Sequence, residues 1–335
     1  MSLPPPSDAA ESWRGRTVLV TGGLGFIGST LARRLCDLGA EVTVLDCLLP
    51  QYGGHRFNLE GYADRLRINI ADLRDTSSLD ALLEGQQVIF NLAGQTSHLD
   101  SMLDPETDLA INVTAQLRLL ESCRRVVPGV RLIYASTRQL YGRPQKLPVD
   151  ERHPIVPVDV NGINKLSAEM YHLLYAKVYD LSASVLRLTN TIGPRMRIRD
   201  ARQTFLGIWV RQLLEGRPIE VWGGEQLRDF NDVEDVVDAL LIAGERLNLP
   251  KKPYNLGSSE VISLADLARL MIELHGSGEL LITPFPEERK KIDIGDYYSC
   301  YAHFKQATGW QPKRTLRQTL RRTLEYYSTW LSRYV

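Results

Sequence analysis

Residues 17–28 read TVLVTGGLGFIG, a β-branched run followed by glycines at the spacing GxxGxxG. The run Thr17–Thr21 predicts a buried strand, and Gly25–Leu38 predicts the helix that follows it. A strand, a glycine-rich turn and a helix, in that order, form the context in which backbone N–H groups bind a pyrophosphate. The segment therefore predicts a dinucleotide-binding fold that starts near the N-terminus.

Each glycine of this turn has an expected role. We expect Gly22 to allow the tight turn, Gly25 to let the pyrophosphate approach, and Gly28 to let the helix pack on the strand. Phe26 and Ile27 open the helix and belong to the same predicted cofactor site.

Beyond this segment, short apolar runs alternate with amphipathic stretches as far as residue 190. The expected strands are Thr17–Thr21, Glu41–Asp46, Arg65–Ile70, Gln87–Asn91, Val130–Ala135 and Ala183–Leu188. The expected helices are Gly25–Leu38, Ser77–Leu83, Glu106–Val127 and Asn161–Tyr179. Near-continuous apolar strands are typical of a parallel sheet that helices cover on both faces. The sequence therefore predicts an α/β fold with a Rossmann-type, doubly wound parallel sheet.

The regular alternation ends after Leu188, where Gly-Pro and Gly-Gly pairs interrupt the chain. The helices expected in this half are Gln203–Glu215, Val233–Arg246, Leu264–His275 and Leu316–Leu331. We interpret residues 1–14 as a disordered lead-in and 15–190 as the cofactor-binding domain. Residues 191–335 are interpreted as a smaller, mainly helical substrate lobe, with about 230–260 packing back on the first domain.

Composition narrows the class of protein. Of 335 residues, 40 are Lys or Arg and 40 are Asp or Glu, so the formal net charge is zero, which argues against a nucleic-acid partner. The four cysteines form no CxxC pair, which predicts neither a disulfide framework nor a metal site. No apolar run reaches the roughly 18–20 residues that span a membrane. We expect a reduced cytoplasmic protein without a membrane partner.

The second predicted strand ends at Asp46. An acidic side chain there accepts hydrogen bonds from the ribose hydroxyls of the cofactor and repels a 2′-phosphate, which favours NAD over NADP. Asp72 and Leu73, just past the third strand, suit adenine recognition, and a simple strand-end cap is the alternative.

Further segments resemble the extended short-chain dehydrogenase/reductases, in order from about Arg16 to Tyr327. These segments are Asn91-Leu92-Ala93-Gly94, Ser101 with Asp104-Pro105 and Asn112, Tyr134-Ala135-Ser136-Thr137 with Tyr141-Gly142, Leu186–Asn190 with Gly193-Pro194, Gln226–Phe230 with Val233 and Asp235, Tyr254–Gly257, and Gly309–Pro312.

The resemblance implies an NAD-dependent nucleotide-sugar epimerase or dehydratase, closest in pattern to the UDP-sugar 4-epimerases. In such enzymes NAD oxidises a sugar hydroxyl, and the hydride returns after chemistry on the keto-sugar. Leu92 and Ala93 would border the nicotinamide, and Ser136 would contact the substrate. Asn190 and Arg228 would hold the substrate diphosphate, because a guanidinium fork matches phosphate oxygens.

Arg228 and a separate cluster of three arginines each have an alternative interpretation. Arg228 is otherwise an ion-pair partner of Asp229 or Asp232. The group Arg195, Arg197 and Arg199 either adds to the anion site or forms a solvated face.

The main departure from the family concerns its catalytic Tyr-x-x-x-Lys pair. Here the segment reads Asn161-Gly162-Ile163-Asn164-Lys165, so the lysine is present and the tyrosine is not. An amide can orient a hydroxyl but cannot take its proton. Lys165 can still bind the nicotinamide ribose, and Thr137 can still bind the sugar hydroxyl.

Three interpretations of the missing base remain open. In the first, another residue supplies it: His98, in the loop after the fourth strand, is the leading candidate, followed by Tyr134, Tyr141 and Tyr171. In the second, a desolvated Lys165 becomes the base. In the third, the protein binds its ligands without redox catalysis.

Two further departures concern the substrate. Family dehydratases and decarboxylases place carboxylates after the threonine, whereas this chain has Arg138 and Gln139, which favours epimerisation. Near the C-terminus, Asp293 stands where the family often has a diphosphate-binding arginine, and Lys290 or Lys291 is the candidate to replace it.

The predicted activity is therefore a nucleotide-sugar epimerase with an atypical base. A net sugar oxidoreductase or dehydratase is one alternative, and a non-catalytic NAD or nucleotide-sugar binding protein is another. By analogy with the family, the helices near Glu106–Val127 and Asn161–Tyr179 predict a homodimer through a four-helix bundle.

Overall fold

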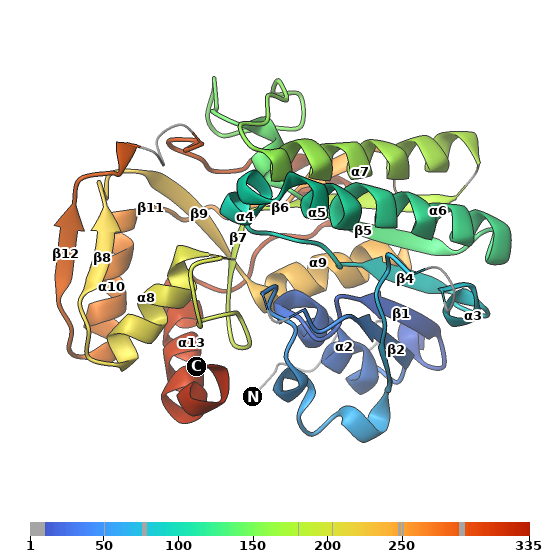
Figure 1. Ribbon diagram of the computed structural model, residues 1–335, viewed down its shortest axis with the longest axis horizontal. Helices are drawn as coiled ribbons and strands as arrows, with labels where there is room; N and C mark the ends of the chain where they lie inside the picture. The colour runs from blue at the N-terminus through green and yellow to red at the C-terminus, as the bar shows by residue number, and fades with distance from the viewer. Residues whose placement is uncertain are drawn as a thin grey trace.

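The computed structural model describes residues 11–49, 51–75, 79–179, 181–202, 204–246, 249, 251–287 and 292–335. Within these residues, seven strands form one parallel sheet in the order β10-β6-β5-β4-β1-β2-β3. They are β1 (Thr17–Thr21), β2 (Glu41–Asp46), β3 (Arg67–Ile70), β4 (Val88–Asn91), β5 (Arg131–Thr137), β6 (Ser182–Leu188) and β10 (Pro253–Asn255). The predicted doubly wound parallel sheet is confirmed (Figure 1).

Helices cover both faces of this sheet (Figure 1). One face carries α2 (Phe26–Asp37), α9 (Val233–Glu245) and α12 (Ala302–Thr308); the other carries α3 (Leu79–Leu83), α6 (Ala115–Val126) and α7 (Val160–Val178). Val18 and Val20 of β1 join the first core, whereas Leu19 joins the second. This two-residue alternation explains why the strands read as continuous apolar runs.

The stretch expected as one helix over Glu106–Val127 is instead three elements. It forms α5 (Pro105–Leu109), a π-helical turn η3 (Ala110–Thr114), and α6. Within the turn, the side chain of Asn112 accepts from the backbone N–H of Gln95 (3.2 Å) and donates to its carbonyl (3.0 Å). A pattern of helix-forming residues cannot reveal this tertiary contact. His98 also differs, since it begins a short helix α4 (His98–Leu103) rather than lying in a loop.

Trp13 contradicts the expectation of a disordered lead-in through residue 14. Its side chain is fully buried, and its ring lies 5.9 Å from that of Phe90 on β4. The indole also packs against Gly244 on α9, where a Cβ would come within 2.8 Å of it. The described chain is therefore part of the fold from residue 11 onward, because the indole completes the core on the α2 and α9 face.

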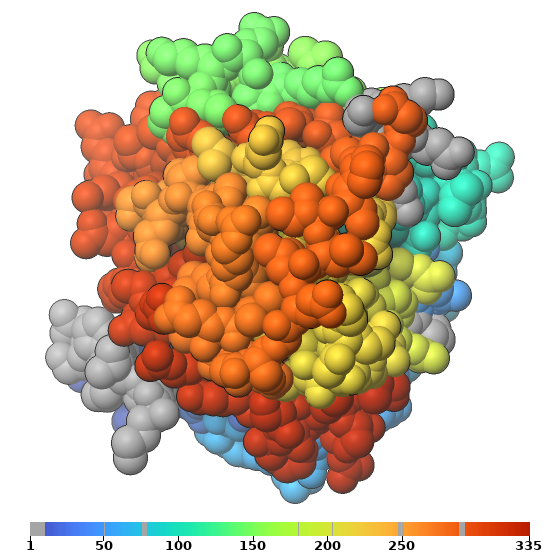
Figure 2. Space-filling view, turned by 90° about the vertical axis from the view of Figure 1, so that its left-hand side faces the viewer, coloured from blue at the N-terminus to red at the C-terminus, as the bar shows by residue number. Residues whose placement is uncertain are grey.

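The C-terminal lobe has its own core, and it forms the face seen in Figure 2. Its helices are α8 (Phe205–Leu214), α10 (Leu264–His275) and α13 (Leu316–Tyr334). Two small sheets join them: β8 (Ile219–Trp222) with β12 (Leu280–Thr283), and β7 (Asn190–Ile192), β9 (Leu227–Asp232) and β11 (Val261–Ser263). Among the described residues, none of the helices has the length and apolarity to cross a membrane.

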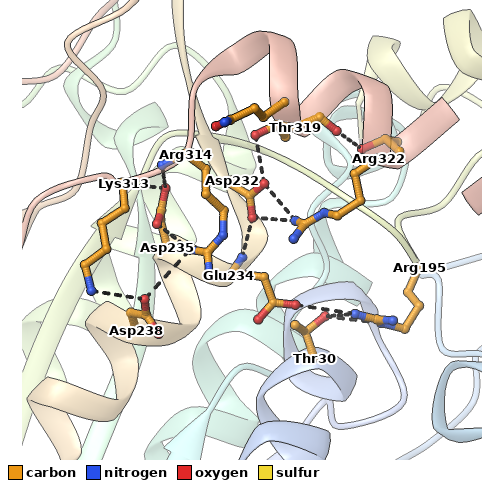
Figure 3. Close-up of polar contacts among 12 residues, drawn as sticks. Thr30, Arg195, Asp232, Glu234, Asp235, Asp238, Lys313, Arg314, Thr319 and Arg322 are labelled. Carbon is orange, nitrogen blue, oxygen red and sulfur yellow. Dashed lines mark hydrogen bonds and ion pairs between the residues drawn. The ribbon is translucent and has the colours of Figure 1, made fainter. Parts of the chain in front are cut away.

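Acidic residues at the start of α9 attach this lobe to the sheet domain (Figure 3). The buried carboxylate of Asp232 accepts from Arg322 (2.6 Å) and Thr319 (2.7 Å) of α13. Asp235 accepts the backbone N–H groups of Lys313 and Arg314, both at 3.1 Å. Pairing of this kind offsets the cost of burying the two carboxylates.

Arg195 belongs to the same contact region rather than to an exposed basic face. Its backbone has a positive φ of 74°. Its guanidinium donates to Thr30 of α2 at 3.2 Å and lies 3.9 Å from Glu234 of α9 (Figure 3).

Candidate active site

A cavity of about 320 Å³ opens at the carboxyl ends of β1, β2, β4, β5 and β6. Open α/β sheets bind ligands at this edge, where the strand order reverses on either side of β1. Most of the residues predicted from the sequence line it: Gly22, Gly25, Phe26, Ile27, Gly28, Asp46, Asp72, Leu73, Leu92, Ala93, His98, Ser136, Thr137, Asn161, Lys165 and Asn190. Arg228 is not part of this lining.

The glycine-rich turn fits a pyrophosphate at one end of the cavity. Gly22 has a φ of +67°, and a Cβ on Gly28 would lie only 2.2 Å from the carbonyl oxygen of Gly22. A Cβ on Gly25 would meet only that same oxygen, at 3.2 Å, so its other side faces open space. Within α2 as described, no side chain caps the N-terminus and no acidic residue lies in the first turn. These N–H groups are therefore available to an anion.

Asp46 lies beside this turn at the end of β2. Its carboxylate accepts the backbone N–H groups of Leu24 (3.0 Å) and Leu48 (2.9 Å), and burial raises its pKa. These bonds fix the carboxylate at the cavity wall. Asp72 is different, because its carboxylate is bound by Arg74 at 2.6 Å, and that hydrogen bond lowers its pKa.

At the other end of the cavity, the amide nitrogen of Asn161 is fully engaged. It donates to the carbonyl oxygen of Gln95 (2.9 Å), to Oε1 of Gln95 (3.2 Å) and to Oδ2 of Asp108 (3.0 Å). An ionised carboxylate only accepts, so Asp108 fixes which end of the amide is nitrogen. Because Asn161 lines the cavity, its Oδ1 is the atom left to meet a ligand, as an acceptor.

Lys165 follows one turn later on α7. Its ammonium donates to the carbonyl oxygen of Ala135 at 2.7 Å and lies 4.3 Å from the centre of the Tyr134 ring. Burial lowers its pKa to about 8, although Asp108 and Glu169 act in the opposite direction. The lysine therefore carries a desolvated positive charge at the cavity wall.

His98 meets a buried carboxylate at the start of α7. Its Nδ1 lies 2.9 Å from Oδ2 of Asp159, the N-cap of that helix. Burial alone would raise the pKa of Asp159, but the contacts with His98, Gly162 and Gln139 together hold it below its usual value. The His98–Asp159 contact is not aligned as a hydrogen bond, and such contacts commonly tighten when substrate binds.

Thr137 and its neighbour Ser136 face different partners. The hydroxyl of Thr137 accepts from the N–H of Gln139 (3.1 Å) and remains on the cavity wall. The hydroxyl of Ser136 donates to Glu169 (2.6 Å), which also forms a buried ion pair with Arg187. Ser136 is thus committed to the buried network, which competes with its expected role in contacting substrate.

Asn190 and Arg228, the residues expected at the substrate diphosphate, are each hydrogen-bonded to other groups of the protein. Asn190 accepts from Arg138 (3.0 Å) and donates to the carbonyl of Asp229 (3.2 Å). Arg228 donates to the carbonyls of Leu227 and Gly295, and burial lowers its pKa to about 10. The alternative, an ion pair with Asp229 or Asp232, is absent within the described chain, where Arg228 instead lies 3.8 Å from Asp293.

The tyrosines that were candidates for the base are not among the residues that line the cavity. Burial raises the pKa of Tyr134 well above its usual value, and burial raises that of Tyr141 to about 12 although Arg187 opposes it. Tyr171 packs against the core beside α6. Lys290 and Lys291 lie outside the described residues.

Comparisons with known proteins identify the family to which this fold belongs. A model of the NAD dependent epimerase/dehydratase family matches residues 18–257. A UDP-glucuronic acid decarboxylase 1 of Xenopus tropicalis is 32% identical over 334 residues, 97% of this chain and 75% of the relative. A putative UDP-glucose 4-epimerase of Methanocaldococcus jannaschii is 31% identical over 314 residues, 92% of this chain and 97% of the relative.

The fold agrees with these matches. The solved structure of a UDP-glucose 4-epimerase with UDP-glucose, from Thermotoga maritima, has a TM-score of 0.86 at 31% identity. That comparison covers 94% of this chain and 99% of the other. This chain belongs to the NAD-dependent epimerase/dehydratase family.

NAD is the cofactor of this family, and the cavity fits it. The open N-terminus of α2 would hold the pyrophosphate and Asp46 the adenosine ribose, while Lys165 would reach the nicotinamide ribose. Asn161, four residues before Lys165 on α7, has its amide held by three acceptors.

Three residues that the sequence did not point to contact the predicted site residues: Asp159 lies against His98, and Asp108 and Gln95 hold Asn161. Asp159 carried a usable signal, since an aspartate just before an apolar helix is a typical N-cap. Asp108 and Gln95 carried none, because their link to Asn161 joins segments that are distant in the chain. Arg138 served only as a reason to exclude dehydration, whereas it lines the cavity.

Asp46→Ala is expected to weaken NAD binding by about 10- to 100-fold, because a charged acceptor for the ribose hydroxyls is lost. The preference for NAD over NADP should fall as well. Isothermal titration of cofactor-free protein with each dinucleotide measures both effects. Glu41→Ala, at the exposed start of the same strand, is the control and should bind like the wild type. Unchanged NAD affinity in Asp46→Ala would place the ribose elsewhere.

Proposed function

We propose that this protein is an NAD-dependent epimerase of a nucleotide-activated sugar, in which His98 replaces the usual tyrosine as the base. One observation carries the proposal: a single cavity joins the glycine-rich turn and Asp46 to Thr137, Lys165 and His98. The family and its UDP-sugar relatives support the substrate class.

When bound, NAD accepts the hydride of the carbon being oxidised and later returns it. Asp159 Oδ2 beside Nδ1 of His98 favours a proton on Nδ1, which leaves Nε2 to accept the proton of the sugar hydroxyl. Thr137 would donate a hydrogen bond to the oxygen of that hydroxyl and orient it, whereas Oδ1 of Asn161, which only accepts, would bind a different hydroxyl of the sugar. Lys165 would place its positive charge beside the oxygen as it loses its proton.

Neighbouring residues favour inversion over elimination or decarboxylation. Arg138 and Gln139 cannot carry protons to and from a keto-sugar near neutral pH. Gln139 is also fixed, since its amide donates to Asp159 at 2.8 Å. Re-reduction from the other face of the sugar needs no further acid or base.

A non-catalytic binding protein is the second candidate function, and Asn161 favours it. Its three hydrogen bonds form a stable polar network at the site where the family's proton acceptor would lie. Such a protein would bind NAD and the sugar nucleotide without turning the sugar over.

We also propose that the protein forms a homodimer through α7 and its neighbours. Ile163, Met170, Leu174 and Val178 of α7 expose 52%, 62%, 49% and 55% of their surface. Their spacing puts them along one side of the helix, and an apolar stripe of this kind is typical of an interface.

The activity is tested by incubating the protein, without added cofactor, with a panel of UDP-sugars. Chromatography and mass spectrometry should show one sugar converted to an isomer of equal mass. His98→Gln should lower that rate by about 100-fold or more, because it removes the proton acceptor. His303→Gln is a matched control: that histidine is equally exposed (38%) and lies 3.0 Å from Glu151. Bound NAD with no isomer formed would favour the binding protein; equal loss in both variants would exclude His98 as the base.

The pH profile separates the two roles open to Lys165. Because burial lowers its pKa to about 8, the ammonium form is lost as pH rises through that value. If Lys165 acts by its charge, kcat/KM should fall above about pH 8, and Lys165→Arg should remove the fall. A rise through the same range would instead identify neutral Lys165 as the base.

Met170→Glu should convert the dimer to a monomer, because it places a charge in the apolar stripe. Light scattering at micromolar concentration measures the mass. Leu281→Glu is the control, since Leu281 is also exposed (48%) but lies on β12 in the other lobe. A wild-type protein of monomer mass would contradict the proposed assembly.

A further inference from the structure

Arg138 carries a positive charge that the described protein does not neutralise. It begins the short helix η4 (Arg138–Tyr141), directly after Thr137, and it lines the cavity. Its Nη2 donates to Oδ1 of Asn190 at 3.0 Å, and its guanidinium stacks over Tyr297 at 4.9 Å. In the described part of the chain it pairs with no carboxylate, and its buried Nη1 has no hydrogen-bond partner.

The nearest acid cannot supply the missing partner. Asp229 is fully buried, but both of its oxygens are taken by Thr189 Oγ1 (2.6 Å) and by the N–H groups of Ser299 (3.2 Å) and Ser258 (3.3 Å). Arg228, on the same strand as Asp229, adds a buried guanidinium and repels that of the half-buried Arg138. An unpaired buried cation is costly, so a compensating anion is expected at this wall.

Asn190 holds the guanidinium in place. Its Oδ1 accepts from Arg138 while its Nδ2 donates to the carbonyl of Asp229, so the amide has both ends committed. This makes Asn190 a positioning residue for Arg138. The stacking on Tyr297 fixes the plane of the guanidinium, and a fixed fork is the geometry that binds a carboxylate or phosphate through two parallel hydrogen bonds.

We propose that Arg138 binds an anionic oxygen group of the ligand, and that this group is a carboxylate on the sugar ring of an acidic nucleotide sugar. This inference rests on the proposed function, since it assumes that a nucleotide sugar fills the cavity. Arg138 directly follows Thr137, which would hold the reacting hydroxyl, and both line the cavity, so the sugar itself is the first candidate to carry the anionic group. The diphosphate offers the same chemistry, and the experiment separates the two.

The test is isothermal titration of the NAD-containing protein with UDP, UDP-glucose and UDP-glucuronate. The wild type should bind UDP-glucuronate about 10- to 100-fold more tightly than UDP-glucose, as expected for one charge-assisted pair. Arg138→Gln should bring that ratio close to one and leave the affinity for UDP unchanged. Arg138→Lys keeps the charge but not the fork, and should retain part of the preference.

Because the preference is a ratio measured on one variant, a general loss of folded protein cannot produce it. Equal weakening of all three ligands in Arg138→Gln would assign Arg138 to the diphosphate and overturn the proposal. An unchanged ratio would overturn it in favour of a structural role. Preference for the acidic sugar without formation of an isomer would support Arg138 as proposed while contradicting the epimerase. Isomerisation of neutral sugars without that preference would do the reverse.

Discussion

The pairing of β1 with β4 on one side and β2 on the other determines where every functional group of this chain lies. The chain leaves the sheet in opposite directions at this point, so a crevice opens at the carboxyl ends of the strands. Buried polar bonds fix its floor: Thr21 donates to Asn91 at 2.9 Å and accepts the N–H of Ala93 at 3.1 Å. The cofactor turn after β1 and the loop after β4 are thereby held together before any ligand contributes.

Within that crevice, Asn161 is held by several neighbouring side chains. A phenol could not satisfy both Asp108 and Gln95 as the amide nitrogen does. The amide therefore belongs to a consistent local network, which also includes Asn164 donating to Asp108 at 2.8 Å. A site that had merely lost its base would keep the surroundings of the lost tyrosine. Here the surroundings suit an amide, and among the described residues His98 of α4 also lines the cavity, which is why we propose it as the base.

Local sequence patterns predicted the parts of the structure that local physics decides. The glycine turn, Asp46 and the sheet follow from residue periodicity and spacing, because a buried parallel strand and a tight turn each need particular residue types nearby. The π-helical turn at Ala110–Thr114 and the burial of Trp13 depend on partners far along the chain, Gln95 and Phe90. The same limit applies to the site: the sequence named His98 and Lys165, but only the fold shows that His98 meets Asp159 and that Lys165 donates to the carbonyl of Ala135.

Two cations at the cavity wall, Lys165 and Arg138, form no ion pair with a carboxylate among the described residues. Asp108 is bound by two asparagines and Glu169 by Arg187. Lys165 donates to a carbonyl and lies over the Tyr134 ring, and Arg138 donates to an amide and stacks on Tyr297. Burial consequently lowers the pKa of Lys165 to about 8. An anionic ligand would raise that pKa again, because it stabilises the ammonium form. By linkage, protonation of Lys165 must then strengthen binding of the anion by the same free energy. The cavity thus couples the charge of its ligand to the charge of Lys165 at its wall.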